Sequence, residues 1–231
     1  MPIKNPTLID HDLTLLSSFT HVLGLDEVGR GCIAGPMYAA GVLVTKDNIA
    51  KLKGKVADSK AISEKLRADA HAAIIADFEY FLAFKSAPQI DSEGLQQCNK
   101  AIFISIIEQA LATGIKKEDL VVLIDGNLDF DLPAHFPQVI CLIKGESKSV
   151  AIAAGSILAK VLRDSLITKM GVTYPKYDFE KNKGYGTPKH MEAVYTHGLS
   201  PEHRRSFLKQ YVLEQLAKEP QGPVVIDPSS L

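Results

Sequence analysis

Short apolar runs alternate with helix-like patterns along this chain, and this alternation limits the possible folds more than any other feature. Five runs have the length and residue types of β-strands. They cover residues 22–26, 37–44, 79–85, 120–124 and 138–143. Helical spacing of apolar residues fills the intervals, giving the order strand, strand, helix, strand, helix, strand, strand and then helices. This order predicts an α/β fold in which helices cover a mixed sheet.

The helical segments have recognisable ends. Ser63 is a suitable cap for a helix over 63–77, and Thr187-Pro188 is a typical helix start. The longest pattern, over 91–113, is predicted to be one helix that ends at Gly114. Further helices are expected near 11–18 and over 150–167 and 202–218, and residues 171–187 are expected to form a loop.

Acidic residues stand at the ends of three of the strand-like runs. Asp26 and Glu27 end the first, Asp125 ends the fourth, and Glu146 follows the fifth. In α/β sheets, functional sites are built at strand ends. Several carboxylates at one edge repel one another unless cations neutralise them, and oxygen ligands favour Mg²⁺ or Mn²⁺. Taken one at a time, however, each acid is better explained as turn chemistry.

Charge and cysteine content exclude some classes of protein. The net charge of -1 does not indicate a nucleic-acid binder, although residues 141–210 hold 12 Lys and Arg against 6 Asp and Glu. That surplus is explained either by a basic surface or by chance imbalance between solvated faces. Cys32, Cys98 and Cys141 are too scattered for a zinc ribbon or a disulfide framework. With no signal peptide and no run of about 20 apolar residues, we expect a soluble cytoplasmic protein without membrane contact.

A glycine-rich segment follows Asp26-Glu27 and carries a family motif. Residues 24–42, GLDEVGRGCIAGPMYAAGV, resemble the signature of type 2 ribonucleases H, the bacterial ribonuclease HII group. Five further segments resemble the family's motifs in the same order: DSKAIS at 58–63, LIDGN at 123–127, AIAAGSILAKVLRD at 151–164, NKGYGTPKH at 182–190 and GLSPEHRRSF at 198–207. The resemblance covers about residues 22–208.

The resemblance implies a ribonuclease H-like fold, with a mixed five-stranded sheet flanked by helices and a helical C-terminal part. It divides the chain into a lead-in (1–20), a catalytic domain (21–170), a C-terminal loop and helices that complete the substrate site (171–218) and a loose tail (219–231). The activity it implies is endonucleolytic hydrolysis of the RNA strand of RNA–DNA hybrids. It also implies cutting on the 5′ side of ribonucleotides embedded in duplex DNA, leaving 3′-hydroxyl and 5′-phosphate ends.

By the same resemblance, Asp26, Glu27, Asp125 and Glu146 form the catalytic and metal-binding set. The implied cofactor is Mn²⁺ or Mg²⁺, with two ions during catalysis. The family normally has Asp where Glu146 stands, after Lys-Gly, and Glu in that role is similar to what type 3 ribonucleases H use. Asp164 is the reserve candidate for the fourth acid, with a salt bridge as its more ordinary role.

Candidate substrate contacts follow from the other motifs. Gly29, Arg30 and Gly31 match the family's Gly-Arg-Gly element for reading the 2′-hydroxyl, and Tyr185 matches the tyrosine that packs on the sugar. Lys60, Lys144, Ser156 and Lys160 are candidate phosphate or active-site contacts. For Arg204 and Arg205, phosphate contact and structural ion pairing are equally good explanations. His190, His197 and His203 are expected to be structural, because their spacing does not form a zinc motif.

Two other functions stay open from the sequence. One is a non-catalytic hybrid-binding protein on the same scaffold, and the other is a metal-dependent phosphatase that acts on small molecules. The C-terminal tail lacks an aromatic pair of the kind that binds sliding clamps, so we expect the protein to act as a monomer.

Overall fold

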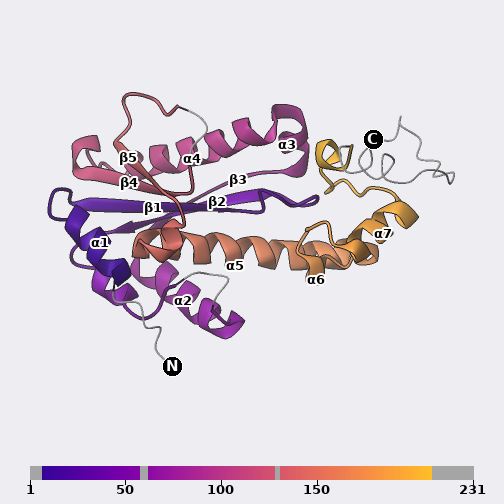
Figure 1. Ribbon diagram of the computed structural model, residues 1–231, viewed down its shortest axis with the longest axis horizontal. Coiled ribbons are helices and arrows are strands. Elements are labelled where there is room, and N and C mark those ends of the chain that lie inside the picture. The colour runs from indigo at the N-terminus through magenta and orange to yellow at the C-terminus, as the bar shows by residue number, and fades with distance from the viewer. Residues whose placement is uncertain (1–6, 58–61, 128–130, 210–231) are drawn as a thin grey trace.

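The computed structural model describes residues 7–57, 62–127 and 131–209. Their strands form one sheet of order β3-β2-β1-β4-β5 (Figure 1). The strands are β1 (His21–Val28), β2 (Met37–Val44), β3 (Glu79–Lys85), β4 (Leu120–Asp125) and β5 (Gln138–Leu142). The helices are α1 (Thr7–Leu15), α2 (Glu64–Asp77), α3 (Ala87–Glu93), α4 (Leu95–Ala112), α5 (Val150–Thr173), α6 (Phe179–Asn182) and α7 (Pro188–His197).

Helices cover both faces of the sheet. In Figure 1, α4 lies along one face and α5 along the other, and α1 and α2 pack outside α5. The short α6 and α7 lie beyond the end of the sheet, next to the C-terminal half of α5 (Figure 1). This arrangement confirms the predicted mixed sheet between helices.

The strand directions bring the acidic strand ends together. β1 is antiparallel to β2 but parallel to β4, and β4 is parallel to β5. The register that pairs Leu25 with Ile124 leaves Asp26 and Asp125 beside each other at the carboxyl ends of β1 and β4. Because parallel neighbours end at the same sheet edge, residues about 100 positions apart in sequence become adjacent.

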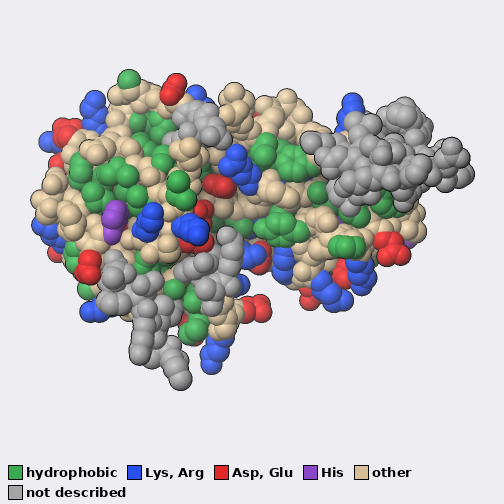
Figure 2. Space-filling view, viewed as in Figure 1, with side chains coloured by type: hydrophobic (Ala, Val, Ile, Leu, Met, Phe, Trp, Pro, Cys, Tyr) green, Lys and Arg blue, Asp and Glu red, His purple; other side chains and the backbone are tan. Residues whose placement is uncertain are grey.

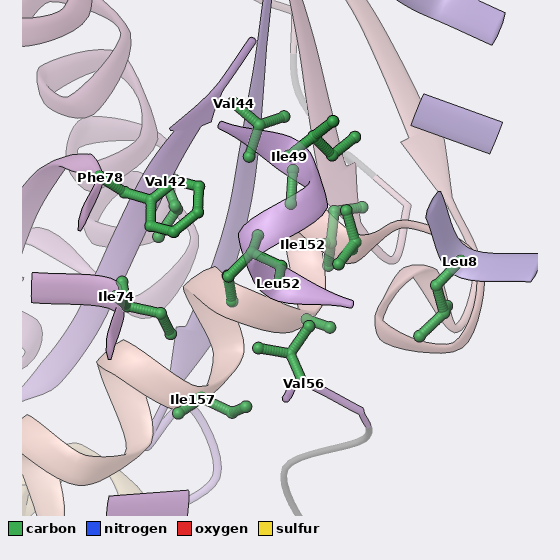
Figure 3. Close-up of a cluster of buried hydrophobic side chains, with 14 of the residues drawn as sticks. Leu8, Val42, Val44, Ile49, Leu52, Val56, Ile74, Phe78, Ile152 and Ile157 are labelled. Carbon is green, nitrogen blue, oxygen red and sulfur yellow. The ribbon is translucent and has the colours of Figure 1, made fainter. Parts of the chain in front are cut away.

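One apolar core lies between the sheet and α5. Figure 3 shows Leu8, Val42, Ile74 and Ile157 among the side chains that meet there from α1, β2, α2 and α5. The N-terminal helix α1 also supplies Asp12, which is fully buried and accepts hydrogen bonds from Ser149 Oγ and Ala151 N, each at 2.9 Å, at the start of α5. A carboxylate at a helix N-terminus satisfies donors that the helix itself leaves unpaired.

Helix α5 approaches the sheet closely because small residues face it. A Cβ on Gly155 would lie only 2.9 Å from the Gly24 carbonyl oxygen and 3.0 Å from that of Ala40. Any larger residue would therefore push the helix away from β1. This close approach places Ser156, the next residue, beside the acidic strand ends.

Most predicted elements are confirmed, including the Ser63 and Thr187 caps, whose side chains accept from Leu66 N and His190 N. The single helix predicted over 91–113 is wrong: Gly94, with φ of 85°, separates α3 from α4, and a Ser86–Gln89 capping box starts α3 earlier. The loop predicted over 171–187 is wrong in part, since α5 continues to Thr173 and α6 follows. For the helix predicted over 202–218, residues 205–209 are helical and the rest lies outside the described residues.

None of the described helices combines the length and apolar character needed to cross a membrane. All three cysteines are free thiols, two of them buried.

Candidate active site

Asp26 is the buried centre of the acidic site. Its side chain stands on β1 with a relative exposure of 8%, and its Oδ1 accepts a hydrogen bond from Glu27 N at 2.7 Å. Burial raises the pKa of Asp26 to about 8; a hydrogen bond from Ser156 opposes this rise, and the charges of Glu27, Asp125 and Glu146 add to it. The charges of the other three predicted carboxylates therefore all reach Asp26.

Two of the other three acids, Asp125 and Glu146, are tied to neighbouring segments by hydrogen bonds. Asp125, at the end of β4, accepts from the backbone N–H of Gly145 through Oδ1, which fastens the turn after β5 to β4. Lys144 begins this turn in the left-handed conformation, with φ of 56°. Glu146, in the following 3₁₀ turn, accepts from Ser156 Oγ at 3.1 Å through Oε2. Ser156 on α5 thus connects Glu146 with Asp26.

These carboxylates do not form a finished metal site. Within residues 7–57, 62–127 and 131–209, no three His, Cys, Asp or Glu side chains converge closely enough to hold an ion. Like-charged groups repel, and here their oxygens accept hydrogen bonds from N–H and hydroxyl donors instead. Burial and the charges of three neighbouring carboxylates nevertheless raise the pKa of Asp26, so a cation bound here would relieve the cost of ionising it. The donor set, all oxygen, fits a hard divalent cation.

The glycine-rich loop after β1 lies beside the predicted tyrosine. Arg30 and Gly31 are exposed at its tip, whereas Gly29 is buried. Tyr185 is 42% exposed, and its hydroxyl forms a hydrogen bond with the buried thiol of Cys32 in the same loop. Burial raises the pKa of Tyr185, and the neighbouring Cys32 raises it further. The structure therefore brings Gly29, Arg30 and Gly31 together with Tyr185.

Three of the four remaining predicted contacts lie in the part of the chain that the structure describes. Lys144 is exposed on the turn before Glu146, and Ser156 joins the acidic group. Lys160, one helical turn after Ser156, forms an ion pair with Asp164 at 2.9 Å. This pair agrees with the salt-bridge role expected for Asp164. Lys60 lies outside the described residues.

Charged side chains are mixed on the visible surface. Acidic side chains gather near the middle of the face in Figure 2, with Lys and Arg side chains beside them. On this face the basic side chains are interspersed with acidic ones rather than collected in one patch (Figure 2).

The sequence also matches a family model, described as ribonuclease HII, over residues 23–210. The chain belongs to the ribonuclease HII family. A ribonuclease HII from Rickettsia rickettsii (strain Sheila Smith) is 40% identical over 187 residues, which is 80% of this chain and 90% of the relative. The family identity makes the chain an endoribonuclease of the ribonuclease H class that acts on RNA–DNA hybrids.

Solved structures support the same fold. The ribonuclease H2 of Pyrococcus horikoshii OT3 aligns with a TM-score of 0.69 and 22% identity, covering 87% of this chain and all of that one. A Bst ribonuclease HIII structure, solved in complex with Mn²⁺, aligns with a TM-score of 0.67 and 21% identity, covering 93% of this chain and 74% of that one. At these identities the likeness establishes the ribonuclease H-like fold alone.

Two buried arginines were not recognised from the sequence. Arg204, expected to contact phosphate or form an ion pair, is fully buried and instead donates to backbone carbonyls. Arg163 does the same from α5. A signal for Arg163 existed, since it shares the buried face of α5 with Ile167 and Met170. Arg205 has an exposed side chain, and its backbone N–H donates to Asp91 at 2.8 Å.

His190 and His203 form a buried pair, with their Nε2 atoms 3.1 Å apart. His190 Nδ1 contacts the Tyr185 carbonyl at 2.8 Å, and His203 Nδ1 accepts from Ser200 N at 3.0 Å. Since a carbonyl only accepts and a backbone N–H only donates, His190 carries its proton on Nδ1 and His203 on Nε2. The chain of hydrogen bonds is complete only when both rings are neutral. It links the Tyr185 backbone to the C-terminal segment.

This pair predicts a loss of stability in acid. Burial lowers the pKa of His203 to about 4, and the charge of His190 lowers it further. The unfolded chain therefore binds protons below about pH 6.5 that the folded chain refuses, so stability present above 6.5 is lost as the pH falls toward 4. We expect His203→Gln to reduce this loss by about 2 kcal/mol, measured as the difference between variant and parent in urea unfolding from pH 7 to pH 4. The exposed His197, changed to Gln, is the control; an unchanged acid slope in His203→Gln would refute the prediction.

Proposed function

We propose that this ribonuclease HII-family enzyme uses divalent metal ions to hydrolyse the RNA strand of hybrids and to cut on the 5′ side of single ribonucleotides in duplex DNA. The products carry 3′-hydroxyl and 5′-phosphate ends. The observation that carries the proposal is the buried Asp26, whose pKa is raised to about 8 by burial and by three more carboxylates at the same sheet edge. Without a cation, such an arrangement only costs stability.

Asp26 and Asp125 are the central ligands in this proposal, with Glu27 and Glu146 at the sides. Mg²⁺ or Mn²⁺, bound as a pair, would supply an activated water and charge stabilisation for the leaving oxygen. Asp26 and Asp125 come from adjacent parallel strands, so their backbones are held rigidly. Glu146 stands on a turn, and its extra methylene relative to Asp lets it reach from there while Ser156 orients its carboxylate.

In this proposal, the glycine-rich loop after β1 and Tyr185 recognise the ribonucleotide of the substrate. The 2′-hydroxyl, a donor and an acceptor, is the chemical difference between RNA and DNA. The exposed backbone at Arg30 and Gly31 lies only a few residues after Asp26 and Glu27 and can pair with that hydroxyl. Tyr185, exposed across from this loop, offers a flat surface for the adjoining sugar. Lys60, Lys144 and Lys160 are proposed phosphate contacts, which add affinity without sequence reading.

A three-substrate assay tests this function. The substrates are an RNA–DNA hybrid, a DNA duplex with one embedded ribonucleotide, and the same duplex entirely of DNA, each titrated with Mg²⁺ and Mn²⁺. We expect the first two to be cut. The all-DNA duplex should be cut more slowly by a factor of about 10² or more, since the 2′-hydroxyl contact is lost. EDTA should abolish cleavage. Equal cutting of the all-DNA duplex, or cutting in EDTA, would contradict the proposal.

The same assay separates the two alternative functions. A non-catalytic binder would retain the hybrid without cutting it at any metal concentration. A small-molecule phosphatase would show no affinity for long duplexes, whereas binding of a duplex by this enzyme should weaken steeply with salt. We further propose that the enzyme acts as a monomer and that it works in the cytoplasm. The free cysteines favour the cytoplasm, because reducing compartments keep thiols unpaired. Sedimentation with and without a hybrid duplex tests the monomer.

A further inference from the structure

Arg163 is a buried cation without an anionic partner. It has no exposed surface, and it forms no ion pair with any residue the structure describes. Its Nε donates to Pro36 O at 2.9 Å, one Nη to Lys183 O at 2.9 Å and the other Nη to Ala34 O at 3.2 Å. Removing a guanidinium from water without a counter-charge costs several kcal/mol. Stability alone is therefore a poor reason for an arginine here.

Arg204 repeats this arrangement from the opposite side of the loop. It too is fully buried, and its Nε and one Nη donate to Gly35 O at 3.0 and 2.8 Å. The other Nη donates to Arg30 O at 3.0 Å, within the Gly-Arg-Gly element itself. Burial lowers the pKa of Arg204 to about 10, and the charge of Arg163 acts in the same direction. The fold thus holds two mutually repelling cations beneath one loop.

The two guanidinium groups together bind the loop of residues 29–36 and the Tyr185 segment. Between them they engage the carbonyls of Arg30, Ala34, Gly35, Pro36 and Lys183. Because carbonyls of the loop point inward to the arginines, the backbone at its tip is held in one conformation.

Direct contacts join the same two segments. Ile33 N and Ala34 N both donate to Gly184 O, at 2.9 and 3.1 Å. The packing leaves no spare room, since a Cβ on Gly29 would collide with the Arg163 guanidinium and one on Gly184 with the Ala34 carbonyl. Arg163 therefore lies against both Gly29 and Gly184, the residue before Tyr185.

We propose that Arg163 and Arg204 are positioning residues that set the selectivity of this enzyme for ribonucleotides. By holding the carbonyls of the loop and of Lys183, they fix the distance between the Gly29–Gly31 backbone and Tyr185. This distance must match the ribose for the 2′-hydroxyl to be read. The inference rests on the proposed function. Reading a hydroxyl through backbone groups requires placement to a fraction of an ångström, so a loosened loop loses discrimination.

The carboxylate site should not depend on the two arginines. Asp26 and Asp125 are held by the pairing of β1 with β4 and by hydrogen bonds from Glu27 N and Gly145 N. Neither arginine contacts these groups. Loss of an arginine should therefore change substrate discrimination while leaving the metal requirement as it was.

Arg163→Lys and Arg204→Lys test the proposal, because lysine keeps the charge but cannot serve several carbonyls from one planar fork. The readout is the ratio of kcat/KM between a duplex with one ribonucleotide and the same duplex with a 2′-deoxy-2′-fluoro nucleotide at that position. We expect the ratio to fall by about tenfold or more in each variant. The half-saturating Mn²⁺ concentration should stay within about twofold of the parent's. Arg205→Lys, an adjacent exposed arginine, should leave the ratio unchanged.

Hydrogen exchange gives a second measurement on the same variants. Amides of residues 30–35 should exchange faster in each Lys variant, and amides of Asp26 and Glu27 should not. A merely structural role would lower the melting temperature and would lower kcat/KM equally for the ribonucleotide and the 2′-fluoro duplexes, so that their ratio stays unchanged. That result would overturn the proposal. So would failure of both variants to fold, since the arginines would then serve the whole fold. If the parent itself shows no preference for the ribonucleotide, the proposed function fails rather than this inference alone.

Discussion

Asp125→Asn is expected to reduce cleavage of an RNA–DNA hybrid by a factor of about 10³ or more, because removing one central ligand charge forfeits several kcal/mol of transition-state stabilisation. The substitution is nearly isosteric. Its amide oxygen can still accept the hydrogen bond from Gly145 N, which holds the turn after β5 in place. The melting temperature should therefore stay close to the parent's. Initial rates on a labelled hybrid at saturating Mn²⁺ provide the measurement.

Two matched controls accompany this variant. Asp131→Asn removes an exposed carboxylate six residues further along and should leave the rate unchanged. Asp164→Asn breaks the ion pair with Lys160 and should cost far less than Asp125→Asn, because Asp164 is not among the charges that act on Asp26. Parent-like cleavage by Asp125→Asn would remove Asp125 from the proposed catalytic set.

Asp26→Asn is expected to abolish activity and yet to stabilise the metal-free protein at about pH 8. Burial raises the pKa of Asp26 from 3.8 to about 8, so between these values the folded chain holds a proton that the unfolded chain has released. The stability this proton provides is complete below about pH 4 and is lost as the pH rises toward 8. Asparagine has no charge to bury, so it avoids the loss.

The expected gain is a few kcal/mol at about pH 8, since four pKa units correspond to an upper limit of about 5 kcal/mol before relaxation of the site. Urea unfolding in EDTA, from pH 4 to pH 9, measures it as the difference between variant and parent. Adding Mn²⁺ should stabilise the parent strongly and Asp26→Asn weakly, because binding to the folded state adds stability. Equal stabilisation of both by Mn²⁺ would argue against Asp26 as a ligand.

Asp12→Asn is the matched control for this second prediction. Asp12 is also buried, but its carboxylate accepts hydrogen bonds from Ser149 Oγ and Ala151 N at the start of α5. The same substitution there should destabilise the protein by about 1–2 kcal/mol, because it weakens charge-assisted hydrogen bonds at a helix N-terminus. If the Asp→Asn change alters the free energy of unfolding in opposite directions at these two buried aspartates, it distinguishes a functional carboxylate from a structural one.

The fold could be predicted from the sequence wherever periodicity and helix caps agreed. β2 and β3 have the predicted bounds, and α2 begins after Ser63 as expected. The break at Gly94 was missed because the predicted helix began at Asp91 and took Gly94 as an interior residue, whereas its positive φ separates α3 from α4. Residues 171–182 looked like a loop because they are polar and punctuated by Pro and Gly, yet packing against α5 holds α6 as a helix.

The candidate acids were predictable for a similar reason. A carboxylate that directly follows an apolar strand lies at the sheet edge whatever the details of the fold, and the family motifs around Asp26 and Asp125 add to that inference. Which acids meet was decided by β1 and β4 pairing in parallel. The part played by Ser156 depended on the close approach of α5 at Gly155.

The sequence by itself determined the layered α/β architecture and the membership of the ribonuclease HII family, and it supplied the four candidate acids, because these follow from local patterns and contiguous motifs. The tertiary structure alone decided the burial of Asp12, the neutral His190–His203 pair and the two arginines beneath the glycine-rich loop. Each of these is a polar side chain whose role depends on partners far away in sequence. An arginine in water and one whose guanidinium holds two or three backbone carbonyls are the same residue in the sequence, and only the packed chain distinguishes them.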